Sequence, residues 1–209
     1  MDRNDGFYEI DLAELFKDSG LEDVFYAKEL QERKLYFNGE VNDMILDCFV
    51  KHIYQYNAED KGIPVDERKP IRIYLTSPGG SVDAGFELID AIEASKTPVH
   101  TINLGYEYSM GFLIGLAGHE RYATKNAKFL MHDGSSFIYN SGGKAQDQMK
   151  FNQRVEERIK QYVLDHSYLS EEEYDANLRV EWYLFADEAK EKGFIEHIIG
   201  VDCDIDDIV

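Results

Sequence analysis

Cysteine is scarce in this chain of 209 residues, which contains only Cys48 and Cys203. Two cysteines are too few for a disulfide framework or for a zinc site built from thiolates. The sequence also lacks HExxH, CxxC and any pair of histidines four residues apart, which are spacings that hold metal ions. We therefore expect no metal site and no cofactor. We also expect a reducing compartment, the cytoplasm.

Long apolar runs and basic residues are missing as well. No stretch approaches eighteen consecutive apolar residues, so we expect no membrane-spanning helix and no membrane partner. The first residues, MDRNDGFYEIDLAELF, are acidic and have no apolar core, so we expect no secretory signal. Lysine and arginine number 22 against 41 acidic residues, a net charge of −19. Nucleic-acid binding depends on cationic contacts to phosphate, so this balance argues against it.

What the chain does contain is an alternation of predicted strands and helices. The apolar run IRIYL predicts a strand, and the helical spacing of Phe86, Ile89 and Ile92 predicts a helix behind it. PVHTINLGY and KFLMH predict further strands, and SMGFLIGLAGH predicts a buried helix. Such alternation is typical of an α/β domain with a largely parallel sheet.

The predicted organisation is one domain with a segment at either end. The expected parts are a leader over 1–22 with a short helix around Leu12–Lys17, a domain over 23–200 containing a long helix over 144–166, and an acidic tail over 201–209. We expect this tail to be a frayed end, as chain termini often are, and the alternative is a tether or contact strand.

Two strand-to-helix junctions carry residues suited to catalysis. In Ser77-Pro78-Gly79-Gly80-Ser81, paired glycines let backbone N–H groups point into open space, at the start of a helix. Such a turn can hold an oxyanion, although on its own it is more often a tight turn without a ligand. The phosphate-binding patterns GxxxxGK[ST] and GxGxxG are both absent.

The second junction is GYEYSMGF, in which Ser109 lies where a strand passes into the buried helix. A serine held there is rigid, and neighbouring N–H groups can donate to a developing oxyanion, so Ser109 is a candidate nucleophile. Taken alone, a serine at a helix start is more often an N-cap. The GxSxG pattern of α/β-hydrolases is not present.

A nucleophilic serine needs a base, and His132 is the candidate among six histidines. It ends the apolar strand KFLMH and precedes the turn residues Asp133-Gly134, a position from which a general base commonly faces a site. It stands 132 − 109 = 23 residues after Ser109, one strand later in an alternating fold. The alternative is a strand-end histidine that only contacts solvent.

Several motifs in one order resemble the family of Clp protease proteolytic subunits. They are TSPGGSVDAGFELIDAIEAS, GYEYSMG, KFLMH, the long helix and ADEAKEKGFIEHII, and the resemblance covers roughly 23–200. It implies a crotonase-like (ClpP-type) βαβ core with a projecting helix-strand handle at about 133–166. It also implies a serine endopeptidase that acts on peptides or unfolded proteins. In this family the subunits form homo-oligomers, heptameric rings or double rings, and an AAA+ unfoldase docks on them.

Carried over residue by residue, the resemblance makes Ser109 the nucleophile and His132 the general base. Gly80 and Met110 match the positions whose N–H groups form the oxyanion hole. The family's triad aspartate falls on Glu181 here, and a glutamate can also orient an imidazolium. Asp175, in EEYDANL, is a second candidate for this role.

The sequence departs from the family in places, and these leave alternatives open. Glu107 and Tyr108 precede the serine where the family has small residues, and Val180 replaces an arginine used between rings. The leader does not resemble the family's axial-pore segment. The alternatives are a non-catalytic or latent assembly or adaptor subunit, a phage-type maturation protease, and a crotonase that handles acyl-CoA.

Overall fold

The computed structural model describes residues 20–134 and 142–209. The predicted leader helix around Leu12–Lys17 and residues 135–141 of the expected handle therefore lie outside the described residues. The strands are β1 (Lys34–Asn38), β2 (Ile71–Ser77), β3 (Val99–Tyr108), β4 (Glu120–Thr124), β5 (Lys128–Met131), β6 (Trp182–Phe185) and β7 (His197–Ile199). The α-helices are α2 (Leu21–Gln31), α3 (Lys51–Glu59), α4 (Val82–Ala94), α5 (Met110–Leu116), α6 (Gly142–Asp165), α7 (Glu171–Asn177) and α8 (Ala186–Glu191).

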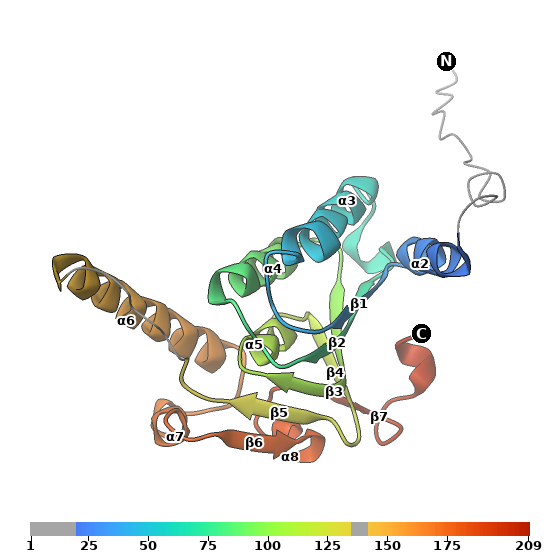
Figure 1. The fold of residues 1–209 in the computed structure, drawn as a ribbon. Coiled ribbons are helices and arrows are strands. Elements are labelled where there is room, and N and C mark those ends of the chain that lie inside the picture. The colour runs from blue at the N-terminus through green and yellow to red at the C-terminus, as the bar shows by residue number, and fades with distance from the viewer. Residues whose placement is uncertain (1–19, 135–141) are drawn as a thin grey trace.

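The strands form one mixed sheet, in the order β1-β2-β3-β4-β7, and all neighbours in this series are parallel. Strand β3 is long enough to pair with two strands in turn. Its first half pairs with β4 and its last residues pair with β5, which continues antiparallel to β6 (Figure 1). The predicted largely parallel α/β sheet is therefore confirmed. The split of β3 brings the end of β5 beside the end of β3.

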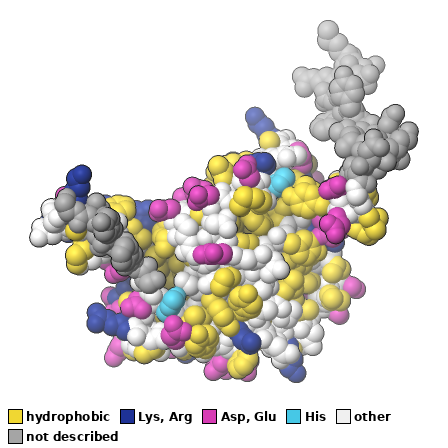
Figure 2. Space-filling model, viewed as in Figure 1, with side chains coloured by type: hydrophobic (Ala, Val, Ile, Leu, Met, Phe, Trp, Pro, Cys, Tyr) yellow, Lys and Arg dark blue, Asp and Glu magenta, His cyan; other side chains and the backbone are white. Residues whose placement is uncertain are grey.

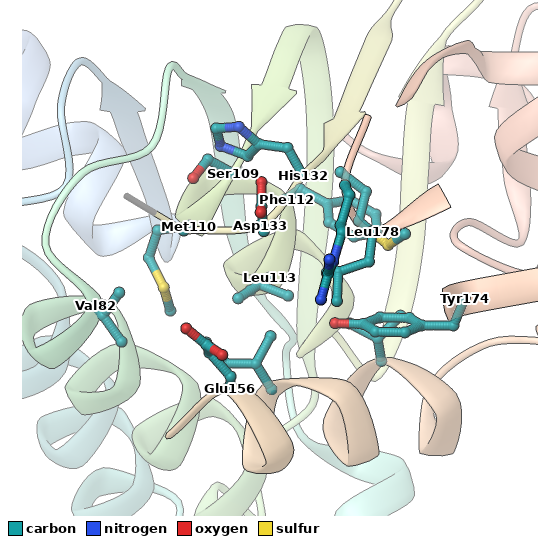
Figure 3. A pocket seen from close by; sticks show the side chains of 15 residues that line it. Val82, Ser109, Met110, Phe112, Leu113, His132, Asp133, Glu156, Tyr174 and Leu178 are labelled. Atoms are coloured by element: carbon teal, nitrogen blue, oxygen red, sulfur yellow. The ribbon is translucent and has the colours of Figure 1, made fainter. Parts of the chain in front are cut away.

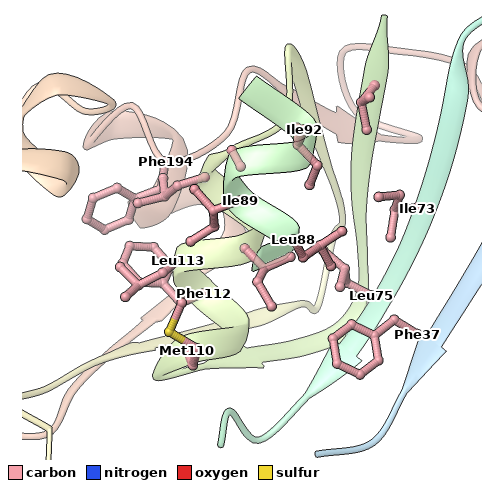
Figure 4. Close-up of a cluster of buried hydrophobic side chains, with 14 of the residues drawn as sticks. Phe37, Ile73, Leu75, Leu88, Ile89, Ile92, Met110, Phe112, Leu113 and Phe194 are labelled. Atoms are coloured by element: carbon pink, nitrogen blue, oxygen red, sulfur yellow. The ribbon is translucent and has the colours of Figure 1, made fainter. Parts of the chain in front are cut away.

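The core lies between the sheet and helices α4 and α5. Leu75 of β2, Leu88 of α4 and Ile114 of α5 are each fully buried, and Figure 4 shows the two helices stacked against the strands. Strand β2 is buried over most of its length, as expected of a central parallel strand covered by helices. Helix α5 is buried at all seven positions, which confirms the predicted buried helix.

Helix α6 extends away from the body of the molecule (Figure 1), and Val163, near its C-terminal end, is its one buried residue among those described. This placement agrees with the long helix predicted over 144–166. The base of α6 is attached to the core, since the Tyr162 hydroxyl donates to the carbonyl oxygen of Leu113 at 3.0 Å.

The C-terminal tail is not frayed, and that prediction was wrong. It forms a 3₁₀ turn over Ile205–Asp207, and Ile208 is buried against Tyr74, Ile102 and Tyr122 on the sheet. The Tyr74 hydroxyl donates to the carbonyl oxygen of Ile208. Ile208 holds the tail in place by burial, with the partly buried Cys203 packed beside it, while Val201, Ile205 and Val209 are exposed.

The surface is acidic over a wide area. Figure 2 shows aspartate and glutamate side chains spread across the visible face, with hydrophobic side chains between them. Among the helices of the described residues, none is long and apolar enough to cross a membrane.

Candidate active site

Ser109 sits in a strained turn between β3 and α5. Its backbone has φ 54° and ψ −122°, and Arg33 is the only other non-glycine residue with a positive φ in the described part of the chain. Its N–H donates to the carbonyl oxygen of Leu130 on β5 at 2.9 Å, which fixes the turn. The side chain makes no capping hydrogen bond. Ser109 thus occupies the N-cap position of α5 without capping the helix through its hydroxyl. A non-glycine residue held in such a strained conformation is typical of a functional position.

The glycine turn after β2 packs directly on this serine. Gly79 has φ +94°, and a Cβ atom placed on it would lie 2.7 Å from the carbonyl oxygen of Tyr108 and 2.8 Å from Ser109 Cβ. No side chain fits into that space, and the positive φ also favours glycine. Gly79 is thus required by both its conformation and its neighbours. The PGG turn is part of the architecture around Ser109.

Gly80 is held by β-type contacts to Val41. The N–H of Val41 donates to the carbonyl oxygen of Gly79 at 2.9 Å, and the N–H of Ser81 donates to the carbonyl oxygen of Val41 at 2.8 Å. Within the described residues, the N–H of Gly80 donates no hydrogen bond. Met110 is the first residue of α5, so its N–H has no acceptor within the helix. These are the two N–H groups that the resemblance assigns to an oxyanion hole.

Ser109 and His132 line the same cavity, which has a volume of about 320 Å³ (Figure 3). His132 follows directly after β5, the strand that pairs with the end of β3. Its side chain is 27% exposed. Across the described residues, no hydrogen bond joins the Ser109 hydroxyl to the imidazole. The sheet thus brings the two side chains to one pocket, but the hydrogen bond that a catalytic serine and histidine share is not formed here. Such bonds often form only when substrate is bound.

The two candidate carboxylates have different surroundings. Glu181 Oε1 lies 3.8 Å from His132 Nδ1, which is beyond hydrogen-bond length, and its side chain is 60% exposed. Its Oε2 accepts a hydrogen bond from the Tyr183 hydroxyl at 2.7 Å. That bond raises the pKa of Tyr183. Asp175 instead pairs with Lys160 at 2.7 Å, so it is committed to a contact between α7 and α6.

The two unusual residues before Ser109 are not part of the cavity wall. Glu107 is buried beneath the turn, where its carboxyl group lies against Gly115 of α5. Burial raises the pKa of Glu107 well above its ordinary value. Tyr108 packs on Tyr106 at 4.9 Å and on Tyr183 at 5.8 Å between ring centroids. Tyr108 therefore packs beside the cavity and is not among the residues that line it.

Sequence reasoning missed most of the cavity wall. Helix α6 contributes Glu156, Ile159 and Val163, and the α7 region contributes Tyr174, Leu178 and Arg179. Nothing in their local sequence distinguishes these positions from ordinary amphipathic helix positions. They reach the site only because α6 and α7 return to the sheet after the segment that follows β5. Within residues 20–134 and 142–209, no cluster of side chains is suited to a metal ion.

Two comparisons relate the sequence of this chain to known proteins. The family model described as Clp protease matches residues 19–202. The chain is also 26% identical, over 186 residues, to a protein of Treponema pallidum (strain Nichols) named ATP-dependent Clp protease proteolytic subunit 2. That alignment covers 88% of this chain and 90% of the relative. Together with the parallel sheet, the family match confirms the resemblance and the expected crotonase-like fold. Of the expected handle, the structure describes the projecting helix α6.

Proposed function

Because this chain belongs to the Clp protease family, we propose that it is a serine endopeptidase that cleaves peptides or unfolded proteins. The observation that carries the proposal is the backbone conformation of Ser109 and its position beside His132. Ser109 is a strained serine whose side chain makes no cap, and it lines one cavity with His132. The combination matches what a nucleophile and its general base require, namely a rigid hydroxyl and a nearby imidazole facing bound substrate.

In the proposed mechanism, Ser109 Oγ attacks the carbonyl carbon of the scissile peptide while His132 accepts the hydroxyl proton. The negative charge that develops on the carbonyl oxygen is stabilised by the N–H groups of Gly80 and Met110. His132 then gives its proton to the leaving amine, and the acyl-enzyme forms. A water molecule, deprotonated by His132, releases the acyl group and restores Ser109.

Glu181 is the proposed partner of the imidazolium that forms during both steps. It is the carboxylate next to His132 Nδ1, whereas Asp175 is held by Lys160. The separation of 3.8 Å requires a small movement of an exposed side chain. Catalytic hydrogen bonds often shorten only when substrate binds, so this movement is compatible with activity.

A fluorophosphonate probe tests the proposal directly, since it reacts with an activated serine. We expect the native protein to be labelled at one site and Ser109→Ala to be unlabelled. Ser81→Ala is a matched control, because Ser81 caps α4 through the N–H of Ala84 at 3.3 Å and should leave labelling intact. Absence of labelling in folded, assembled native protein would contradict the proposal.

We also propose that the chain works as a homo-oligomer, in a ring or double ring. Helix α6 projects from the body and exposes large apolar side chains, Met149 at 54% and Phe151 at 57%. Exposed apolar side chains on a projecting element are typical of surfaces that are covered in an assembly.

A latent assembly subunit is the second candidate function. It is favoured by the distance between His132 and Glu181 and by the hydrogen bond that ties Glu181 to Tyr183. A latent subunit would assemble normally, yet it would show neither probe labelling nor loss of activity on Ser109→Ala. The labelling experiment above therefore separates the two candidates.

A further inference from the structure

The cavity beside Ser109 has a mostly apolar wall, and two acidic residues, Asp133 and Glu156, also line it. Val82, Leu113 and Ile159 line it together with Met110, the residue after Ser109. Glu156 of α6 also lines it, and in Figure 3 its carboxylate points toward the space between Val82, Met110 and Leu113. An apolar wall accepts an aliphatic chain, while a carboxylate among such side chains attracts a cation at the end of that chain.

The Glu156 carboxylate is available to a ligand. Within the described residues, Glu156 forms no ion pair and no hydrogen bond. By contrast, Lys160, four residues later on the same helix, is paired with both Glu171 and Asp175. Lys160 is thus engaged by other carboxylates, and Glu156, an exposed residue at the cavity wall, keeps its charge.

Besides Tyr174, whose pKa is raised to about 12 by burial, three other titratable or charged groups line the cavity and must be weighed against Glu156. His132 and Asp133 lie after β5, and Arg179 follows Leu178. In Figure 3 Leu178 and Tyr174 lie on the side opposite Val82 and Glu156. Two carboxylates against one guanidinium leave the cavity with a net negative charge when His132 is neutral. A cationic substrate group is therefore favoured over an anionic one.

We propose that this cavity binds the substrate side chain on the acyl side of the scissile bond, and that it selects an aliphatic chain ending in a cation, as in lysine or arginine. Glu156 is the specificity-determining residue, because it would pair with the cation while Val82, Leu113 and Ile159 contact the chain. The inference rests on the proposed function, since it concerns the peptide that Ser109 would cleave.

The test compares fluorogenic peptides that differ only in this side chain, with lysine, norleucine or glutamate at the position. Norleucine has an aliphatic chain like that of lysine without its ammonium group, so the ratio of kcat/KM for lysine over norleucine isolates the charge. We expect this ratio to fall about fivefold in Glu156→Gln, as for a partly exposed ion pair. Glu156→Lys should reverse the order and favour glutamate.

Glu157→Gln is the matched control. Glu157 is the next residue on α6 and lines a separate cavity with Asp83 and Phe86, so the same loss of charge there should leave the ratio unchanged. An equal ratio in the native protein, Glu156→Gln and Glu157→Gln would overturn the inference. A native preference for glutamate that Arg179→Gln abolishes would overturn it as well.

Failure of the proposed function has a different signature. If the fluorophosphonate probe does not label Ser109 and no peptide is cleaved, the peptidase proposal itself fails. If Ser109 is labelled and all peptides are cleaved without dependence on residue 156, only the specificity inference fails.

Discussion

Gly79 and Ser109 are in such close contact that a methyl group on the glycine would overlap the serine. The Cβ of an alanine at position 79 would lie 2.8 Å from Ser109 Cβ, 2.7 Å from the carbonyl oxygen of Tyr108 and 3.0 Å from the nitrogen of Met110. The turn after β2 therefore sets the position of the strained serine from one side. The hydrogen bond from Ser109 to Leu130 sets it from the other.

Gly79→Ala should damage both stability and activity. We expect the free energy of unfolding to fall by about 3 kcal/mol, from the cost of a positive φ and from overlap with the Ser109 turn. Activity should fall further than the loss of folded protein explains, because the turn must shift. Urea unfolding and probe labelling measure the two effects.

Gly62→Ala is the control for this substitution. Gly62 has φ +95°, almost the same as Gly79, but nothing lies within 4 Å of its Cβ position. It should lose only about 1 kcal/mol, the backbone cost, and keep full labelling. Equal effects of the two substitutions would show that the contact with Ser109 is unimportant.

Glu181 and Tyr183 should affect catalysis in opposite directions. Glu181→Gln removes the charge that would stabilise the His132 imidazolium, so we expect kcat/KM to fall about tenfold, less than at a buried triad acid because Glu181 is exposed. Tyr183→Phe removes a competing hydrogen bond and should raise kcat/KM about twofold. Peptide hydrolysis assays measure both.

The comparison with Asp175 decides which carboxylate acts. Asp175→Asn should leave kcat/KM nearly unchanged, because Asp175 pairs with Lys160. If Asp175→Asn abolishes hydrolysis while Glu181→Gln does not, the assignment of Glu181 is wrong.

Glu107 should make stability depend on pH. Burial raises its pKa in the folded state, while an unfolded glutamate has a pKa of about 4.3. The folded state therefore holds this proton more tightly. Its contribution to stability is full below about pH 4.3 and is lost as pH rises toward the folded-state pKa.

Glu107→Gln removes this dependence, because the amide does not titrate. The free energy of unfolding of the native protein should decline with rising pH relative to that of Glu107→Gln, as measured by urea unfolding between about pH 5 and pH 8. Glu157→Gln, at an exposed position, should track the native protein. Parallel curves for the native protein and Glu107→Gln would contradict the prediction.

The apolar surface of α6 should govern assembly. Phe151→Glu places a charge on an exposed apolar position of the projecting helix, so we expect a lower mass in size-exclusion chromatography with light scattering. Val201→Glu, at a position 60% exposed near the C-terminus, is the control and should assemble normally. An unchanged mass for Phe151→Glu would show that this part of α6 lies outside the interface.

The sequence by itself determined the α/β alternation, the buried helix after Ser109 and the identity of the candidate nucleophile and base. These are local signals: apolar periodicity, paired glycines and a histidine at a strand end. The motif order also indicated the family, which the comparisons confirm. The prediction of a frayed tail was wrong, because the burial of Ile208 depends on a sheet face formed by strands distant in the chain.

Only the tertiary structure decided what surrounds Ser109. Because β3 pairs with β5 at its end, His132 lies at the cavity beside Ser109. Because α6 returns to the body of the molecule, Glu156 lines the same cavity. The choice between Glu181 and Asp175 also depends on contacts across the fold, since Lys160 engages one of them and not the other. Such contacts join residues far apart in sequence, so no local pattern encodes them.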